Sequence, residues 1–326
     1  VLSISGCAKQ EGTIRSERAG SQSDAGSVMA ELDAGETKDM VFSGTELDLS
    51  NVDGEPVKFF PMDDRIFFLV FDNGSYTIYS MNRNGEDVCL CCAPKLEYGE
   101  SIYSLCGSAD GEYRVVTNQS ASDAVHYYIV SLNENGSVMD RQDITEALDM
   151  PFDEFITNIL VDREDRVAAA TDKRVIVLND SYKRVGEVQP QGEFFQGIAR
   201  GLDGGIICSA YEQEHVSVWR IDMEAAGLKD HTVLVCNTPG GSDFLKNGSG
   251  SYDFYYCDDS GVFGHSFEEG KTRELMDFAA SAVSPDEASG ILPVSDGIML
   301  SNRWDMNDGW KTVLYQKMDP AMGKDK

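Results

Sequence analysis

The sequence predicts an all-β protein built as a six-bladed β-propeller, and three observations lead to this prediction. The hydrophobic segments are too short for amphipathic helices and rich in β-branched residues. Turns containing Asp, Asn, Gly and Ser separate them. A unit of strand, tight turn and strand recurs along the chain at the spacing of propeller blades.

The stretch from Phe155 to Val188 shows the unit most clearly. Four short β-type segments lie within it, separated by polar turns, at residues 155–161, 166–171, 174–178 and 184–188. A single four-stranded antiparallel meander cannot bury both of its faces, so it needs neighbouring copies. We therefore expect this stretch to be one blade among several.

The copies are marked by acidic residues in the turn between the first and second strands. The turn acids Asp64, Asp110, Asp165, Asp203 and Asp296 are separated by 46, 55, 38 and 93 residues, and the last interval contains one weaker copy near Gly250. Six blades result, beginning with four strands at residues 57–60, 65–71, 76–81 and 87–92. The next five blades span residues 102–144, 155–188, 197–236, 243–276 and 290–317.

The sixth blade supplies only three strands, at residues 290–293, 298–302 and 312–317. One strand near residues 40–49 has no partner close to it in the sequence. We expect this N-terminal strand to complete the last blade, because closing the ring removes an open sheet edge. The long connection at residues 277–289 leaves a seven-bladed arrangement as the alternative.

Composition excludes several classes of function. The 326 residues include 56 acidic and 27 basic side chains, for a formal net charge of -29. Nucleic-acid binding needs a positive field, so it is not expected. No run of about 18 apolar residues is present, which excludes a transmembrane helix.

The N-terminus resembles the lipobox that ends a bacterial lipoprotein signal peptide. Ile4, Ser5 and Gly6 precede Cys7 in the required order of an aliphatic residue, two small residues and cysteine. The resemblance implies lipid attachment to the Cys7 sulfur, so that the membrane is contacted only through this lipid. We divide the chain into a signal-peptide remnant (1–6), a lipidated flexible tether (7–38), the propeller (39–318) and a C-terminal linker or tail (319–326).

The remaining seven cysteines do not predict a metal site or a full set of disulfides. Cys89, Cys91 and Cys92 lie together, but no histidine is near them in the sequence, and an odd number cannot pair completely. Cys89 and Cys91 are expected to share one face of a strand. We interpret the cysteines as small core residues and expect no metal and no cofactor.

Candidate contact residues gather on one rim, where the turns between second and third strands lie beside the inter-blade connections. Tyr211, Arg303 and Trp304 are the candidates for binding a ligand or partner, since exposed aromatic side chains and arginine are favoured in interfaces. The alternative is that Trp304 packs between blades. No catalytic motif is present, and we predict no catalytic residues.

The lipobox, the polar tether and the propeller followed by a lysine-rich tail resemble lipoproteins of gut Firmicutes in which a propeller precedes the solute-binding domain of an ABC importer. The resemblance implies an acidic repeat protein anchored to the outer face of the cell membrane. It would be a non-catalytic binding or interaction module, accessory to capture of a carbohydrate or peptide. Its partners would be an unknown protein or small solute and ABC-transporter components. An exported propeller enzyme, such as a glycosidase or lyase, is the alternative. Three or more converging titratable side chains in the central pocket would favour the enzyme.

Overall fold

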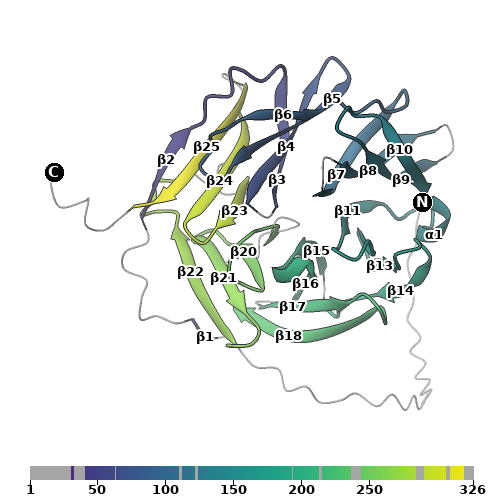
Figure 1. Cartoon of the computed structure of the whole chain (residues 1–326). Coiled ribbons are helices and arrows are strands. Elements are labelled where there is room, and N and C mark those ends of the chain that lie inside the picture. Colours follow the sequence, from purple (N-terminus) through teal and green to yellow (C-terminus); the bar gives the residue numbers. More distant parts are fainter. Residues whose placement is uncertain are drawn as a thin grey trace, which may run out of the picture.

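The chain forms six antiparallel sheets arranged radially around a central axis (Figure 1). The computed structural model describes residues 31–32, 41–62, 64–109, 112–121, 124–192, 194–212, 215–235, 244–283, 290–305 and 309–318. The predicted lipidation residue Cys7 and the tail at 319–326 lie outside the described residues, as does the tether apart from Glu31–Leu32. The all-β, six-bladed prediction is confirmed.

Each blade contains four strands that follow one another in the sequence, except the last. Blade one comprises β3 (Glu55–Met62), β4 (Arg65–Asp72), β5 (Ser75–Asn82) and β6 (Cys89–Cys92). Blade two comprises β7 (Glu100–Ala109), β8 (Glu112–Ser120), β9 (Val125–Leu132) and β10 (Val138–Asp143). Blade three comprises β11 (Ile156–Val161), β12 (Val167–Thr171), β13 (Val175–Leu178) and β14 (Arg184–Val188).

The second half repeats this plan. Blade four comprises β15 (Phe194–Arg200), β16 (Ile206–Glu212), β17 (His215–Asp222) and β18 (Gly227–Val235). Blade five comprises β19 (Leu245–Lys246), β20 (Phe254–Cys257), β21 (Gly261–Ser266) and β22 (Lys271–Asp277). Blade six comprises β23 (Ile291–Ser295), β24 (Ile298–Asp305) and β25 (Gly309–Lys317), with β2 (Phe42–Glu46) as its fourth strand.

The ring closes as the sequence predicts. Strand β2 pairs antiparallel with β25, with Phe42 opposite Lys317 and Glu46 opposite Val313. In Figure 1 the purple N-terminal strand β2 therefore lies beside the yellow C-terminal strand β25. This pairing replaces an exposed sheet edge with backbone hydrogen bonds.

Three small elements were not expected. The two-residue strand β1 (Glu31–Leu32) pairs in parallel with the outer strand β22 of blade five, within the segment predicted as a flexible tether. Helix α1 (Thr145–Leu148) lies in the connection from blade two to blade three, and the 3-10 helix η2 (Leu202–Gly204) in a turn of blade four. None of the described helices is long and apolar enough to cross a lipid bilayer.

The hydrophobic core is divided among the blade interfaces. Six clusters of buried side chains are present in the described residues, one between each pair of adjacent blades. Strands β12 and β13 of blade three are buried along their whole length, because both faces of this blade are covered by neighbours. This explains why their sequence is continuously apolar (Val-Ala-Ala-Ala-Thr and Val-Ile-Val-Leu) instead of alternating.

Candidate functional site

The first strand of every blade faces the centre of the ring, and single hydrogen bonds join successive inner strands. The Lys58 ammonium donates to the Tyr103 carbonyl (2.9 Å), and the Tyr103 hydroxyl donates to the Ile156 carbonyl (3.4 Å). The Asn158 amide donates to the Ile198 carbonyl (3.2 Å). These contacts connect β3 to β7, β7 to β11 and β11 to β15.

The other half of the ring is connected in the same way. The Arg200 backbone N–H donates to Asn247 Oδ1 (2.8 Å), just past β19, and the Ser249 N–H donates to the Pro293 carbonyl of β23 (3.3 Å). Asn302 on β24 donates its amide to the Pro56 carbonyl (3.3 Å). Inner-strand polar side chains therefore fix the width of a central channel.

This channel encloses a cavity of about 470 Å³ lined by residues from all six inner strands. Three cationic side chains line it, from Lys58, Arg200 and Lys246. No aspartate or glutamate is among the described lining residues. The described channel wall is therefore positively charged, whereas the chain as a whole has a net charge of -29.

Lys58 has the most distinctive surroundings of the three. Its ammonium lies 5.7 Å from the centroid of the Phe60 ring and 5.3 Å from that of Tyr103, positions that favour cation–π attraction. It forms no ion pair with any described residue. The Lys58 side chain is exposed to the channel, and partial desolvation by the surrounding walls lowers the pKa of Lys58.

The channel opens into a wider mouth of about 560 Å³ at the rim formed by the first-to-second-strand turns. Arg114, Arg163 and Arg200 line this mouth, together with three acidic residues, Glu112, Asp162 and Asp165. Arg200 belongs to both cavities and reaches the ends of two other inner strands, donating to the Val161 carbonyl (2.8 Å) and the Cys106 carbonyl (3.2 Å). Arg200 is thus the charged residue that the described linings of mouth and channel share.

Two of the three acidic residues of the mouth have structural partners. Asp162 accepts the N–H groups of Glu164 and Arg166 at 2.9 Å and pairs with the Arg166 guanidinium at 2.7 Å. Asp165 pairs with Arg114 of the preceding blade. These carboxylates therefore hold turns and blades together.

Two of the repeated turn acids, Asp165 and Asp296, have a structural explanation. Asp165 of blade three binds Arg114 of blade two, and Asp296 of blade six accepts a hydrogen bond from the Tyr255 hydroxyl of blade five (2.9 Å). In both cases the acid binds a side chain of the preceding blade. Gly250 is needed beside this contact, because a Cβ there would lie 1.9 Å from the Tyr255 oxygen.

The predicted contact residues Tyr211, Arg303 and Trp304 lie on the opposite rim, and none lines the channel or its mouth. Tyr211 ends β16 and packs, half-buried, against the core between blades four and five. Trp304 stacks edge-to-face on Trp310 across the β24–β25 hairpin, with ring centroids 5.7 Å apart. The structure does not bring the three together, because blade five separates them.

This opposite rim nevertheless carries a concentration of exposed aromatic side chains. Trp304 is 54% exposed and Phe194 66%, while Tyr98 and Phe152 are fully exposed in inter-blade connections. Large exposed apolar side chains on one face indicate a contact surface. Tyr211, Arg303 and Trp304 therefore remain candidates for partner contact.

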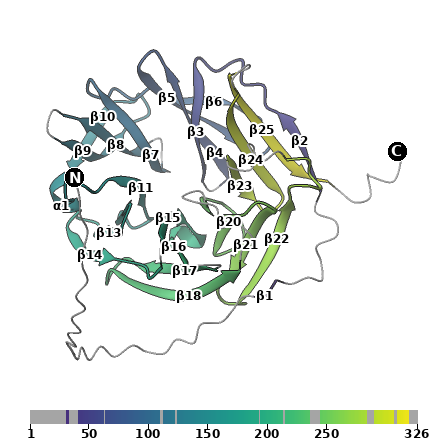
Figure 2. The same ribbon diagram turned by 180° about the vertical axis from the view of Figure 1, so that it is seen from behind.

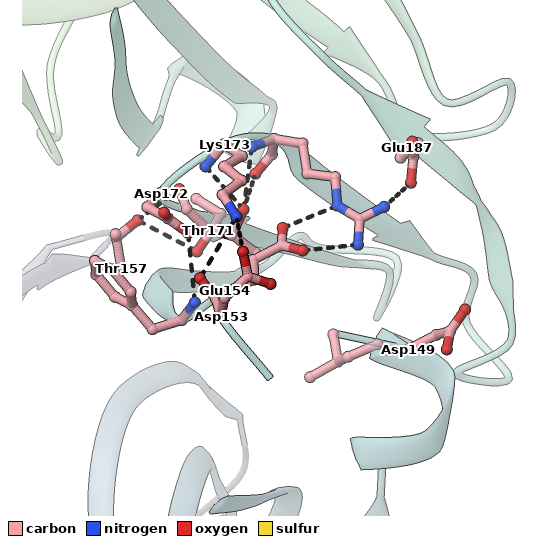
Figure 3. Close-up of polar contacts among 12 residues, drawn as sticks. Asp149, Asp153, Glu154, Thr157, Thr171, Asp172, Lys173 and Glu187 are labelled. Carbon is pink, nitrogen blue, oxygen red and sulfur yellow. Dashed lines mark hydrogen bonds and ion pairs between the residues drawn. The ribbon is translucent and has the colours of Figure 1, made fainter. Parts of the chain in front are cut away.

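At the opposite rim of blade three, basic side chains are paired with carboxylates, unlike those in the channel (Figure 3). Arg174 binds the buried Glu154 carboxylate through two hydrogen bonds of 2.9 Å and also contacts Glu187. Lys173 pairs with Asp153 at 3.0 Å. Arg174 lowers the pKa of Glu154, because the hydrogen-bonded guanidinium stabilises the ionised carboxylate.

The residues that line the channel were missed by sequence reasoning. Lys58, Arg200 and Lys246 each interrupt or end an otherwise apolar first strand. Once a propeller was predicted, charged residues in first strands were the signal that pointed to the channel. Among the described residues no group of three or more His, Cys, Asp or Glu side chains is arranged as a metal site.

Comparison with known proteins shows the fold and no family. No protein-family model and no curated protein sequence matches the chain. A luciferin-regenerating enzyme is similar in structure, with a TM-score of 0.51 at 11% identity, covering 85% of this chain and 96% of that one. An oligogalacturonate lyase from Vibrio parahaemolyticus gives a TM-score of 0.48 at 9% identity over 81% of this chain and 79% of that one.

A protein from Bacteroides fragilis, described as exported, gives a TM-score of 0.49 at 10% identity. It covers 90% of this chain and 99% of that one. At 11% identity, the likeness to the luciferin-regenerating enzyme shows a shared fold alone, so function has to be argued from the site itself.

Proposed function

We propose that this propeller is a non-catalytic binding module that captures a small solute carrying a carboxylate, either an acidic carbohydrate or an acidic peptide, in its central channel. The observation that carries the proposal is the channel wall, where Lys58, Arg200 and Lys246 occur without a carboxylate among the described lining residues. Guanidinium and ammonium groups bind carboxylates through charge-assisted hydrogen bonds. The cavity volumes lie within the range typical of small-molecule sites.

Binding energy would come from several parts of the site. The ligand carboxylate would lie near Arg200 at the junction of mouth and channel, and the amides of Asn158 and Gln196 offer neutral hydrogen bonds deeper inside. Tyr252 and Phe67 line the mouth and supply apolar contact area.

The experiment compares matched pairs of ligands that differ only in charge. Glucuronate with glucose, and alanyl-glutamate with alanyl-glutamine, are titrated calorimetrically into the protein. We expect an acidic member to bind and its neutral counterpart to bind far more weakly. Equal binding of both members, or no binding by either acid, would overturn the proposal.

The wider setting extends the resemblance stated from the sequence. We propose that lipid on Cys7 holds the propeller at the outer face of the cell membrane, where it assists an ABC importer, with the rim of Tyr211, Arg303 and Trp304 contacting a partner protein. One geometric observation supports this setting: the Met318 N–H donates to the Val41 carbonyl (2.9 Å), so both ends of the propeller lie together. The Lys317 N–H donates to the Gly297 carbonyl (3.0 Å), which puts these ends on the same rim as the mouth.

A lyase is the second candidate, because two lysines, Lys58 and Lys246, line the same channel. Partial desolvation lowers the pKa of Lys58, which suits a general base that removes a proton from carbon beside a carboxylate. The arginines would bind the carboxylate but cannot act as bases. Incubation with an acidic polysaccharide and measurement of unsaturated product in the ultraviolet distinguishes this candidate, and product formation that Lys58→Met abolishes would establish it.

A further inference from the structure

A second cluster of reactive side chains lies away from the channel wall, on the outer strand of blade one. The Cys89 and Cys91 sulfurs lie 3.3 Å and 3.2 Å from the same oxygen, Ser80 Oγ. The two sulfurs are therefore within about 6.5 Å of one another, which is the sum of the two distances. Cys89 is exposed and Cys91 half-buried, so the pair is open to solutes.

A β-bulge brings these thiols together. The pairing of β5 with β6 shifts register between Ile78 and Tyr79, with Leu90 opposite Tyr79 and Cys92 opposite Ile78. Cys91 is the extra residue of the bulge. Bulges redirect side chains, and here Cys91 contacts Ser80 while Cys92 stays buried in the apolar core.

The surroundings of the pair are cationic, and the side-chain oxygens beside the sulfurs belong to neutral hydroxyl groups. Arg65 Nη2 lies 3.4 Å from Cys89 Sγ, and Arg65 Nε donates to Ser80 Oγ at 3.1 Å. The Tyr113 hydroxyl of blade two is hydrogen-bonded to Cys91. No carboxylate or imidazole of the described residues contacts either sulfur.

From this geometry we propose that Cys89 and Cys91 bind one soft monovalent metal ion, such as Cu(I), between their two sulfurs. Thiolates select soft ions, whereas Zn²⁺ usually requires four protein ligands in a structural site. Two protein ligands are therefore too few for a structural Zn²⁺ site. The site differs from the solute-binding channel and does not depend on it.

The reaction balances in charge. Two thiols and one Cu(I) give a bis-thiolate complex of net charge -1 and release two protons, with no change of oxidation state. The Arg65 guanidinium beside Cys89 offsets the negative charge of the complex. Because binding displaces one proton from each thiol, the affinity increases with pH.

The test is an anaerobic titration of the reduced full-length chain with Cu(I) in competition with bathocuproine disulfonate. We expect the wild type to retain one Cu(I) more than Cys89→Ser/Cys91→Ser, with two sulfur neighbours in X-ray absorption. Cys208→Ala, which removes a buried thiol of blade four, is the control and retains the ion. Arg65→Gln keeps a hydrogen-bond donor but removes the charge, and we expect it to lower the affinity about tenfold.

Circular dichroism of each variant establishes that the propeller is intact, which separates loss of the site from loss of the fold. Equal Cu(I) content in the wild type and in Cys89→Ser/Cys91→Ser would overturn the proposal. So would a folded, reduced wild type that takes no Cu(I) from the competitor.

Discussion

Two sets of basic side chains in this propeller have opposite surroundings. At the opposite rim of blade three, Arg174 and Lys173 form ion pairs with Glu154, Glu187 and Asp153 (Figure 3). In the channel, Lys58 faces aromatic rings and a carbonyl, and no carboxylate is among the described lining residues. A cation that is neutralised within the fold stabilises it, whereas a cation directed into an acid-free cavity indicates an anionic ligand.

The two sets lie on different parts of the ring. In Figures 1 and 2 the first strands β7, β11 and β15 border the centre, whereas Lys173 and Arg174 lie in the turn between β12 and β13. The net charge of -29 is therefore a property of the whole surface and does not describe the site. The variants below test this contrast.

The largest effect is expected for Arg174→Met at the opposite rim. It leaves the buried Glu154 carboxylate without its bidentate partner and should lower the free energy of unfolding by about 3 kcal/mol. Ligand binding should be unchanged. Chemical denaturation measures the first and calorimetry the second, and loss of affinity in the folded variant would contradict the separation of the two sets.

The same ion pair predicts a pH dependence. Arg174 lowers the folded-state pKa of Glu154 below its ordinary value of 4.5. The stability contributed by this pair is therefore present above the unfolded-state pKa and lost as the pH falls through the folded-state pKa. Denaturation curves between neutral and acidic pH should show this loss in the wild type and a smaller loss in Arg174→Met.

The second effect is expected for Arg200→Gln in the channel. The amide retains an N–H donor for the Val161 carbonyl but removes the charge. Losing a charge-assisted hydrogen bond to the ligand carboxylate should cost about 2 kcal/mol, or roughly a thirtyfold loss of affinity. Lys173→Gln, which removes an exposed charge at the opposite rim, is the matched control and should bind the acidic ligand as the wild type does.

A smaller effect is expected for Lys58→Met. Because desolvation lowers the folded-state pKa of Lys58, charging this group costs stability below that pKa, and the cost disappears as the pH rises toward the unfolded-state pKa. Methionine should therefore stabilise the ligand-free protein at pH 7 by about 0.5 kcal/mol, a small value because channel water still screens the ammonium.

The same variant should weaken acid binding and remove its dependence on alkaline pH. In the wild type, affinity should fall as the pH rises through the lowered pKa of Lys58, since the neutral amine no longer attracts a carboxylate. Thermal denaturation and calorimetry over the alkaline range measure both quantities. A destabilised Lys58→Met at neutral pH would show that the cation serves the fold.

The smallest effect is expected for Lys173→Ala. Its ion pair with Asp153 is exposed to solvent on both sides, with side-chain exposures of 47% and 77%. Such pairs contribute little to stability and are screened by salt, so the denaturation midpoint should be nearly unchanged. A change in the denaturation midpoint that persists in high salt would indicate a larger structural role for the turn.

Much of the fold follows from local sequence. Short β-branched segments, Asn-Gly turns and the repeated turn acids indicated the blades, and the closing strand followed from one blade with three strands. The two-residue pairing of β1 with β22 was not predictable, because it rests on a long-range contact with no local pattern.

The sequence analysis did not identify the channel, because exposed aromatic residues directed attention to Tyr211, Arg303 and Trp304. The structure places Tyr211 on blade four and the other two on blade six. Contact with a partner at this rim stays a prediction. The cavities lie in the channel and at the other rim. Cys89 was expected in the core, but the structure exposes it, because it lies on the outermost strand of its blade.

The sequence by itself predicted six blades, with seven as the alternative, together with the closure of the ring, and its composition determined the net charge, since each depends on local periodicity or on composition. Tertiary structure alone decided that Lys58, Arg200 and Lys246 meet around one channel and that Cys89 and Cys91 share one hydroxyl. The physical reason is that the ring brings together cationic side chains up to 188 residues apart in the sequence (Lys58 and Lys246), and a bulge changes the direction of a side chain without a signature in composition.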